Sequence, residues 1–126
     1  MEFEVEKNLE RWIKGISNKE ALPENIKALN FGIFESENGY TVYLTGSNEY
    51  DAEDDDWACN EDFTPSNRYL EFNKEEISKL DWEQFLKYIV ESLKNIIKAE
   101  NQDEYKILNV VNIATGFDDG DLIKIK

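Results

Sequence analysis

Residues 31–46 read FGIFESENGYTVYLTG, and they carry the clearest local signal in the chain. The pair Asn38-Gly39 is a preferred hairpin turn, because both residues tolerate positive φ. A turn formed by these two residues places Glu37 opposite Tyr40. The same register gives three further pairs: Glu35–Val42, Phe34–Tyr43 and Ile33–Leu44. Apolar side chains then share one face of the hairpin, as a half-buried sheet requires: Phe31, Ile33, Val42 and Leu44.

Two helices are predicted from apolar residues at helical spacing. Residues 3–16 form an amphipathic helix whose apolar stripe consists of Val5, Leu9, Trp12, Ile13 and Ile16. A longer core helix begins after Asp81, a good N-cap residue with Gln84 three positions later. Its apolar stripe consists of Trp82, Phe85, Leu86, Ile89, Val90, Leu93, Ile96 and Ile97. A short helical turn is expected at residues 22–29, and another helix start at Asn73.

The remaining strands are predicted at residues 67–72, at 107–115, and in the closing LIKIK after the turn signal Asp119-Gly120. We therefore predict one α+β domain over residues 1–126. It has an antiparallel sheet of about five strands, with the N-terminal helix and the long central helix packed on one face.

Composition indicates a packed and strongly acidic protein. Of 126 residues, 40% are hydrophobic and 13% are aromatic, which favours a folded core over a disordered acidic chain. The net charge is −14, so nucleic acids and anionic membranes are unsuitable partners. The sequence has no apolar run of the ~20 residues that span a bilayer, no basic and apolar signal segment, and a single cysteine. We expect a cytoplasmic protein. Its oligomeric state stays open.

The negative charge is concentrated in one region. Residues 28–67 contain ten acidic residues and no basic one, whereas the other 86 residues carry a net charge of only −4. Within this region, residues 49–62 read EYDAEDDDWACNED. Its eight acidic side chains are Glu49, Asp51, Glu53, Asp54, Asp55, Asp56, Glu61 and Asp62. We call residues 49–62 the acidic segment and expect it to be a long loop.

Enzyme chemistry is poorly supported, and no cofactor is expected. The chain contains no histidine, the commonest general base and a frequent zinc ligand. Cys59 has no histidine to activate it, and its acidic neighbours disfavour a thiolate. The sequence also has no glycine-rich phosphate-binding motif. We therefore predict a protein without catalytic residues.

A calcium or magnesium site is an alternative use of the carboxylates. An EF-hand starting at Asp51 would place Asp56 where the sharp turn needs glycine, so this loop type is disfavoured. An irregular divalent-metal site in the acidic segment stays open. The segment GFDDGDL raises the same question through Asp118, Asp119 and Asp121. There, a polar hairpin turn is the favoured interpretation.

Recognition of a basic protein surface is the favoured use of the acidic segment, since eight like charges cost self-repulsion that solubility does not require. An aromatic residue within such a loop can serve as a desolvated anchor for a partner. Trp57 is the candidate, although an aromatic residue in a long loop more commonly fixes that loop to the protein core. A mimic of nucleic acid that inhibits a DNA-binding protein would have the same electrostatic character.

Two segments resemble a known group of proteins: DWACNEDFTP at residues 56–65 and ATGFDDGDL at residues 114–122. Together with the small acidic α+β architecture, they are similar to immunity proteins of bacterial polymorphic-toxin and contact-dependent-inhibition systems. This resemblance implies a non-enzymatic inhibitor of a cognate toxin, and many such toxins are basic nucleases. We expect the acidic segment, Trp57 and the turn of Asp118, Asp119 and Asp121 to contact the toxin.

Overall fold

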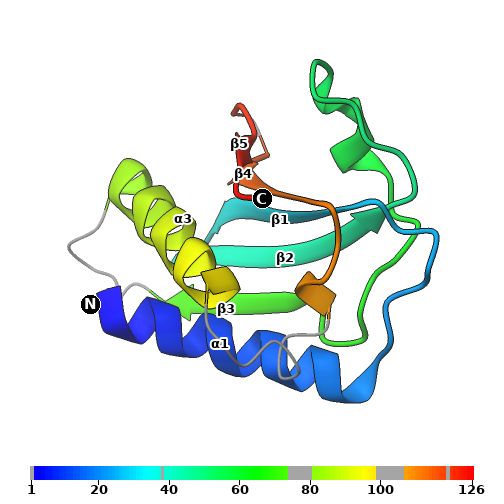
Figure 1. Cartoon of the computed structure of the whole chain (residues 1–126). Coiled ribbons are helices and arrows are strands. Elements are labelled where there is room, and N and C mark those ends of the chain that lie inside the picture. The colour runs from blue at the N-terminus through cyan, green and yellow to red at the C-terminus, as the bar shows by residue number, and fades with distance from the viewer. Residues whose placement is uncertain (1, 38, 74–80, 99–106, 119) are drawn as a thin grey trace.

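The computed structural model describes residues 2–37, 39–73, 81–98, 107–118 and 120–126, and it has an α+β fold (Figure 1). Two α-helices, one 3₁₀ helix and five strands follow one another along these residues. In chain order they are α1 Glu2–Lys19, β1 Ala28–Ser36, β2 Gly39–Ser47, η1 Asp55–Cys59, β3 Tyr69–Asn73, α3 Trp82–Lys98, β4 Asn112–Phe117 and β5 Ile123–Lys124. The predicted fold class is confirmed.

The five strands form one mixed sheet in the order β3-β2-β1-β4-β5. Three neighbouring pairs are antiparallel, but β1 and β4 are parallel. The sheet is therefore mixed, whereas an antiparallel sheet was predicted. The difference arises because the chain returns from β3 through α3, and a long crossover of this kind can bring a strand back in a parallel direction.

The β1–β2 hairpin has the predicted faces but a different register. Ser36 pairs with Gly39 and Ile33 pairs with Val42, so the predicted pair of Glu37 with Tyr40 is wrong by two residues. Gly39 has a φ of 152°, which glycine adopts readily, and it is the first paired residue of β2. A slip of two residues keeps every side chain on its face, because side chains alternate along a strand. Asn38 lies outside the described residues.

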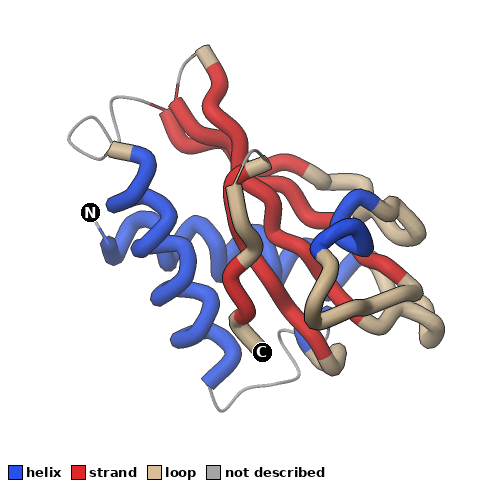
Figure 2. The backbone as a smooth tube through the Cα atoms, turned by 90° about the horizontal axis from the view of Figure 1, so that it is seen from above, coloured by secondary structure: helices blue, strands red, loops and turns tan. Residues whose placement is uncertain are grey.

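Both helices pack on one face of the sheet and enclose the main core (Figure 2). The five predicted stripe residues of α1 are all buried, and the Trp12 ring lies edge-on to Phe31 with centroids 6.1 Å apart. α3 starts with a reciprocal cap: Asp81 Oδ1 accepts from the Gln84 N–H at 2.9 Å, and Gln84 Oε1 accepts from the Asp81 N–H at 3.3 Å. The predicted helix start is therefore confirmed.

Two smaller predictions differ from the structure, and a third falls outside the described residues. Residues 22–27 contain a turn at positions 24–25 instead of a helical turn, and β1 begins at Ala28. β4 begins only at Asn112, so it is shorter than predicted, and residues 107–108 are in a short 3₁₀ turn. The helix start expected after Asn73 falls on residues 74–80, outside the described residues.

The second face of the sheet has no α-helix over it in the described part of the chain, and we call it the open face. The short helix η1 lies on this side, opposite α1 and α3 (Figure 2). The acidic segment thus packs on the open face, where it forms one wall of the site described next.

Candidate functional site

Trp57 attaches the acidic segment to the open face. Its side chain is only 6% exposed and packs against Ala28 of β1 and Ala114 of β4, with the Tyr50 ring centroid 5.3 Å away. The small alanine side chains leave room for the indole. Trp57 therefore fixes the loop to the core, and its burial argues against its use as an exposed partner anchor.

Three carboxylates of the acidic segment accept hydrogen bonds from backbone N–H groups of the segment or of the residue before it. Asp54 Oδ1 accepts from the Asp56 N–H at 3.0 Å and caps η1. Asp51 Oδ1 accepts from the Glu53 N–H at 2.9 Å, and Asp62 Oδ2 accepts from the Asn48 N–H at 2.9 Å. Part of the acidity thus has a structural role, because the loop offers few backbone partners for these N–H groups.

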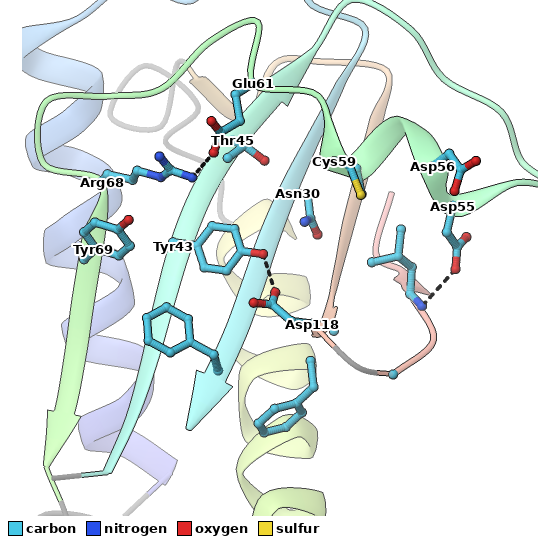
Figure 3. Close-up of a pocket in the computed structure, with 16 residues that line it drawn as sticks. Asn30, Tyr43, Thr45, Asp55, Asp56, Cys59, Glu61, Arg68, Tyr69 and Asp118 are labelled. Atoms are coloured by element: carbon cyan, nitrogen blue, oxygen red, sulfur yellow. Dashed lines mark hydrogen bonds and ion pairs between the residues drawn. The ribbon is translucent and has the colours of Figure 1, made fainter. Parts of the chain in front are cut away.

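A cavity of about 560 Å³ lies between η1, the open face and the β4–β5 turn (Figure 3). It brings together both acidic regions of the sequence. Asp55, Asp56 and Glu61 of the acidic segment line it together with Asp118 of the turn. The Leu122 N–H donates to Asp55 Oδ2 at 3.4 Å and links the two regions directly.

The other predicted site residues lie outside this cavity. Glu49, Asp51 and Asp54 border a separate hollow beside Lys27, and Glu53, Asp62 and Asp121 are exposed. Asp119 lies outside the described residues. The structure therefore places four of the predicted acidic residues in the cavity and six others outside it.

Asn30 and Thr45 lie opposite each other on β1 and β2 and line the same cavity. They are only 4% and 2% exposed. Asn30 Oδ1 is buried and has no hydrogen-bond partner among the described residues. Leaving such an acceptor unpaired costs about 1–3 kcal/mol. Asn30 was not among the predicted site residues, although a polar residue within an otherwise apolar strand was a usable signal.

Tyr43 lies beside Asn30 and reaches across to the β4–β5 turn. Its hydroxyl donates to Asp118 Oδ1 (Figure 3). Burial raises the pKa of the Tyr43 hydroxyl, and the hydrogen bond to the Asp118 carboxylate raises it further. The ring covers Gly32 so closely that a Cβ added there would be 2.1 Å from Tyr43 Cζ. Glycine at position 32 therefore allows the tyrosine to lie over the sheet.

Arg68 is the one basic side chain among the described residues that line the cavity. It forms an ion pair with Glu61. Its guanidinium carbon is 5.7 Å from the Tyr43 ring centroid and 5.4 Å from that of Tyr69, which are cation–π distances. Arg68 is paired with Glu61, so no basic side chain among the described lining residues offsets the other three carboxylates. The cavity therefore has an excess of negative charge from Asp55, Asp56 and Asp118.

Two exposed aromatic residues line the cavity or the hollow next to it. Tyr69 is 51% exposed, and Trp82 at the first position of α3 is 53% exposed. Trp82 packs edge-on against Phe117 and lines a second hollow that also includes Asp118. Trp82 was predicted to belong to the buried stripe of its helix, and this prediction is wrong. Full burial begins with Phe85, one turn later, because Trp82 lies at the helix end.

The described residues contain neither a cluster of metal-binding side chains nor a membrane-spanning helix. No three Asp, Glu or Cys side chains among them are grouped closely enough to hold a metal ion. Cys59 is an exposed free thiol. Among the same residues, no helix has both the length and the apolar character needed to cross a bilayer.

Comparison with protein-family models, with curated proteins and with solved structures finds no match for this chain. The function must therefore be inferred from the residues and geometry of the site. Those features are an acidic cavity, a buried unpaired acceptor, and two exposed aromatic side chains in the cavity and the second hollow.

Proposed function

We propose that this protein is a non-enzymatic immunity protein that binds and neutralises a cognate bacterial toxin domain with a basic surface, such as a nuclease. One observation carries the proposal. Two acidic regions more than 50 residues apart in sequence lie around a single cavity on the face of the sheet opposite the helices. The resemblance of residues 56–65 and 114–122 to immunity proteins supports the same conclusion.

Electrostatics favour a basic partner. The chain carries a net charge of −14, and residues 28–67 contribute most of it. A field of this kind steers an oppositely charged protein towards the acidic face and speeds association. The attraction is screened over about 10 Å at 0.1 M salt, so association is expected to slow as the salt concentration rises.

The exposed aromatic residues supply the apolar part of the interface. Hot spots are enriched in Trp and Tyr and lie near the centre of an interface, surrounded by polar contacts. Trp82 and Tyr69 are candidates for this role, since both are about half exposed. Tyr69 lines the cavity, and Trp82 lines the second hollow, which shares Asp118 with the cavity. A specific interface of standard size would bury about 800 Å² on each partner.

The first test uses the toxin domain encoded next to this gene and measures binding kinetics at several salt concentrations. Asp56→Lys is expected to slow association and to reduce its salt dependence, because Asp56 is exposed and borders the cavity. Trp82→Ala is expected to weaken binding by about 2 kcal/mol or more, mainly through faster dissociation. Glu24→Lys makes the same charge change on an exposed residue outside the cavity and should have a smaller effect.

Two results would contradict the proposal. If the toxin binds Asp56→Lys and Trp82→Ala with the rates and salt dependence of the unmodified protein, the acidic face is not the interface. If the toxin domain does not bind the unmodified protein and its activity is not inhibited, the immunity function itself is wrong.

A further inference from the structure

We propose that the cavity on the open face receives an arginine side chain of the partner protein, and that its guanidinium group reaches Asn30. This inference rests on the proposed function, because it takes the partner to be a basic protein. It adds the chemical group that is recognised and the residue at which recognition takes place.

Asn30 provides the first reason. Its side chain is 96% buried in the wall of the cavity, and its Oδ1 atom has no partner among the described residues. Figure 3 shows this side chain between Tyr43 and Cys59, among the residues that surround the cavity. A buried carbonyl oxygen without a partner favours a ligand that donates hydrogen bonds.

The carboxylates provide the second reason. Asp55, Asp56 and Asp118 line the cavity in addition to Glu61, which is paired with Arg68. A guanidinium has five N–H donors and no acceptor, so it can satisfy an amide oxygen and a carboxylate at the same time. A neutral donor would leave the carboxylates without a counter-charge.

The aromatic rings favour arginine over lysine. Arg68 already shows how this face holds a guanidinium, near the Tyr43 and Tyr69 rings and against a carboxylate. The part of the cavity nearer to β4 offers another ring and another carboxylate through Phe34 and Asp118. A planar guanidinium stacks on such rings, whereas the ammonium of lysine is a compact, strongly hydrated charge. The volume of about 560 Å³ is within the 300–1,000 Å³ typical of ligand pockets.

The experiment uses N-acetyl-L-arginine N-methylamide, which imitates an arginine within a peptide, and follows its binding by NMR. The Asn30 side-chain amide and the backbone amides of Tyr43 and Thr45 are expected to shift with increasing ligand. The citrulline analogue has nearly the same shape but no charge, and the lysine analogue has the charge but no planar group. Both should bind more weakly than the arginine compound, by about tenfold for citrulline.

Single substitutions test which side chains bind the guanidinium of the arginine compound. Asn30→Leu is expected to weaken binding of the arginine compound by about tenfold, whereas Asn30→Asp keeps an acceptor and should bind at least as well as the unmodified protein. Asp118→Asn should weaken binding several-fold. Tyr43→Phe removes the hydrogen bond to Asp118 but keeps the ring and the carboxylate, so it should retain binding. Glu53→Gln is the matched control, because it removes a charge from the acidic segment outside the cavity.

Three results would overturn the inference. The first is the absence of shifts at Asn30, and the second is equal binding of the arginine and citrulline compounds. The third is free L-arginine binding about tenfold or more tightly than the blocked compound, because that would identify a free metabolite as the ligand. Thermal unfolding of Asn30→Leu and Asn30→Asp shows whether a loss of binding reflects misfolding. If Asn30→Leu does not fold, binding by Asn30→Asp still tests the inference.

Failure of this inference can be separated from failure of the proposed function. If Asp56→Lys impairs toxin binding while Asn30→Leu does not, the immunity function stands and the arginine site is wrong. If the arginine compound shifts Asn30 but the toxin domain does not bind, the site stands and the immunity function is wrong.

Discussion

At the scale of single residues, the burial of two tryptophans contrasts with the character of their neighbours in the sequence. Trp57 occurs among acidic residues, yet it is buried on the alanines of β1 and β4. Trp82 occurs in an apolar helical stripe, yet it is more than half exposed beside Asp118. Burial depends on what packs against each indole, which neighbouring residues in the sequence do not specify.

Trp57→Ala should therefore reduce stability, whereas Trp82→Ala should mainly affect binding. Removing a buried tryptophan typically costs about 3–5 kcal/mol, through lost burial and the cavity left behind. Urea unfolding followed by circular dichroism measures this free energy for both variants. A loss below about 1 kcal/mol for Trp57→Ala would show that the acidic segment is not attached to the open face through this residue.

At the scale of elements, the open face depends on glycines at paired positions of neighbouring strands. Gly32 of β1 pairs with Gly116 of β4. Gly32 makes room for the Tyr43 ring, and a Cβ added to Gly116 would be 2.7 Å from the backbone oxygen of Asp121. These two positions allow Tyr43 and the β4–β5 turn to lie close to the sheet, and so they shape the cavity.

Gly116→Ala should destabilise the protein by about 1–3 kcal/mol, because backbone atoms must move to admit the methyl group. Gly15→Ala is the matched control. Gly15 lies within α1 with no atom within 4 Å of an added Cβ, so alanine there should stabilise by about 0.5–1 kcal/mol. Chemical unfolding of both variants checks the two signs. Equal effects would mean that Asp121 does not lie against β4.

At the scale of the whole molecule, the apolar core and the concentrated negative charge lie on opposite sides of the sheet. The two helices and the inner face of the sheet enclose the main apolar cluster, while the acidic segment lies on the other side of the sheet. This arrangement exposes a large negative charge without placing it in the core. It also leaves the folded state with self-repulsion, because compaction brings like charges together.

Added salt should therefore stabilise the protein. Raising the salt concentration from about 0.01 M to 0.1 M shortens the screening length from about 30 Å to 10 Å and weakens repulsion across the molecule. We expect the thermal midpoint to rise over this range, equally in sodium and potassium chloride, and to rise less in Glu53→Gln. A falling midpoint would mean that screening of ion pairs such as Glu61–Arg68 outweighs the repulsion.

Much of the fold follows from local patterns in the sequence. Alternating apolar residues predict both faces of the β1–β2 hairpin, helical spacing predicts α1 and α3, and the pair Asp81 and Gln84 predicts where α3 begins. These features depend on side-chain periods and caps within one element, so neighbouring residues are sufficient to specify them.

The candidate site was only partly predictable. The sequence by itself determined the α+β class, the faces of the elements and the concentration of negative charge in residues 28–67. Only the tertiary structure decided that β4 lies parallel to β1, that Asp55 and Asp118 border one cavity, and that Asn30 is buried there without a partner. The physical reason is that a periodic pattern specifies which side of an element is buried. The segments that meet on the other side depend on how the whole chain packs.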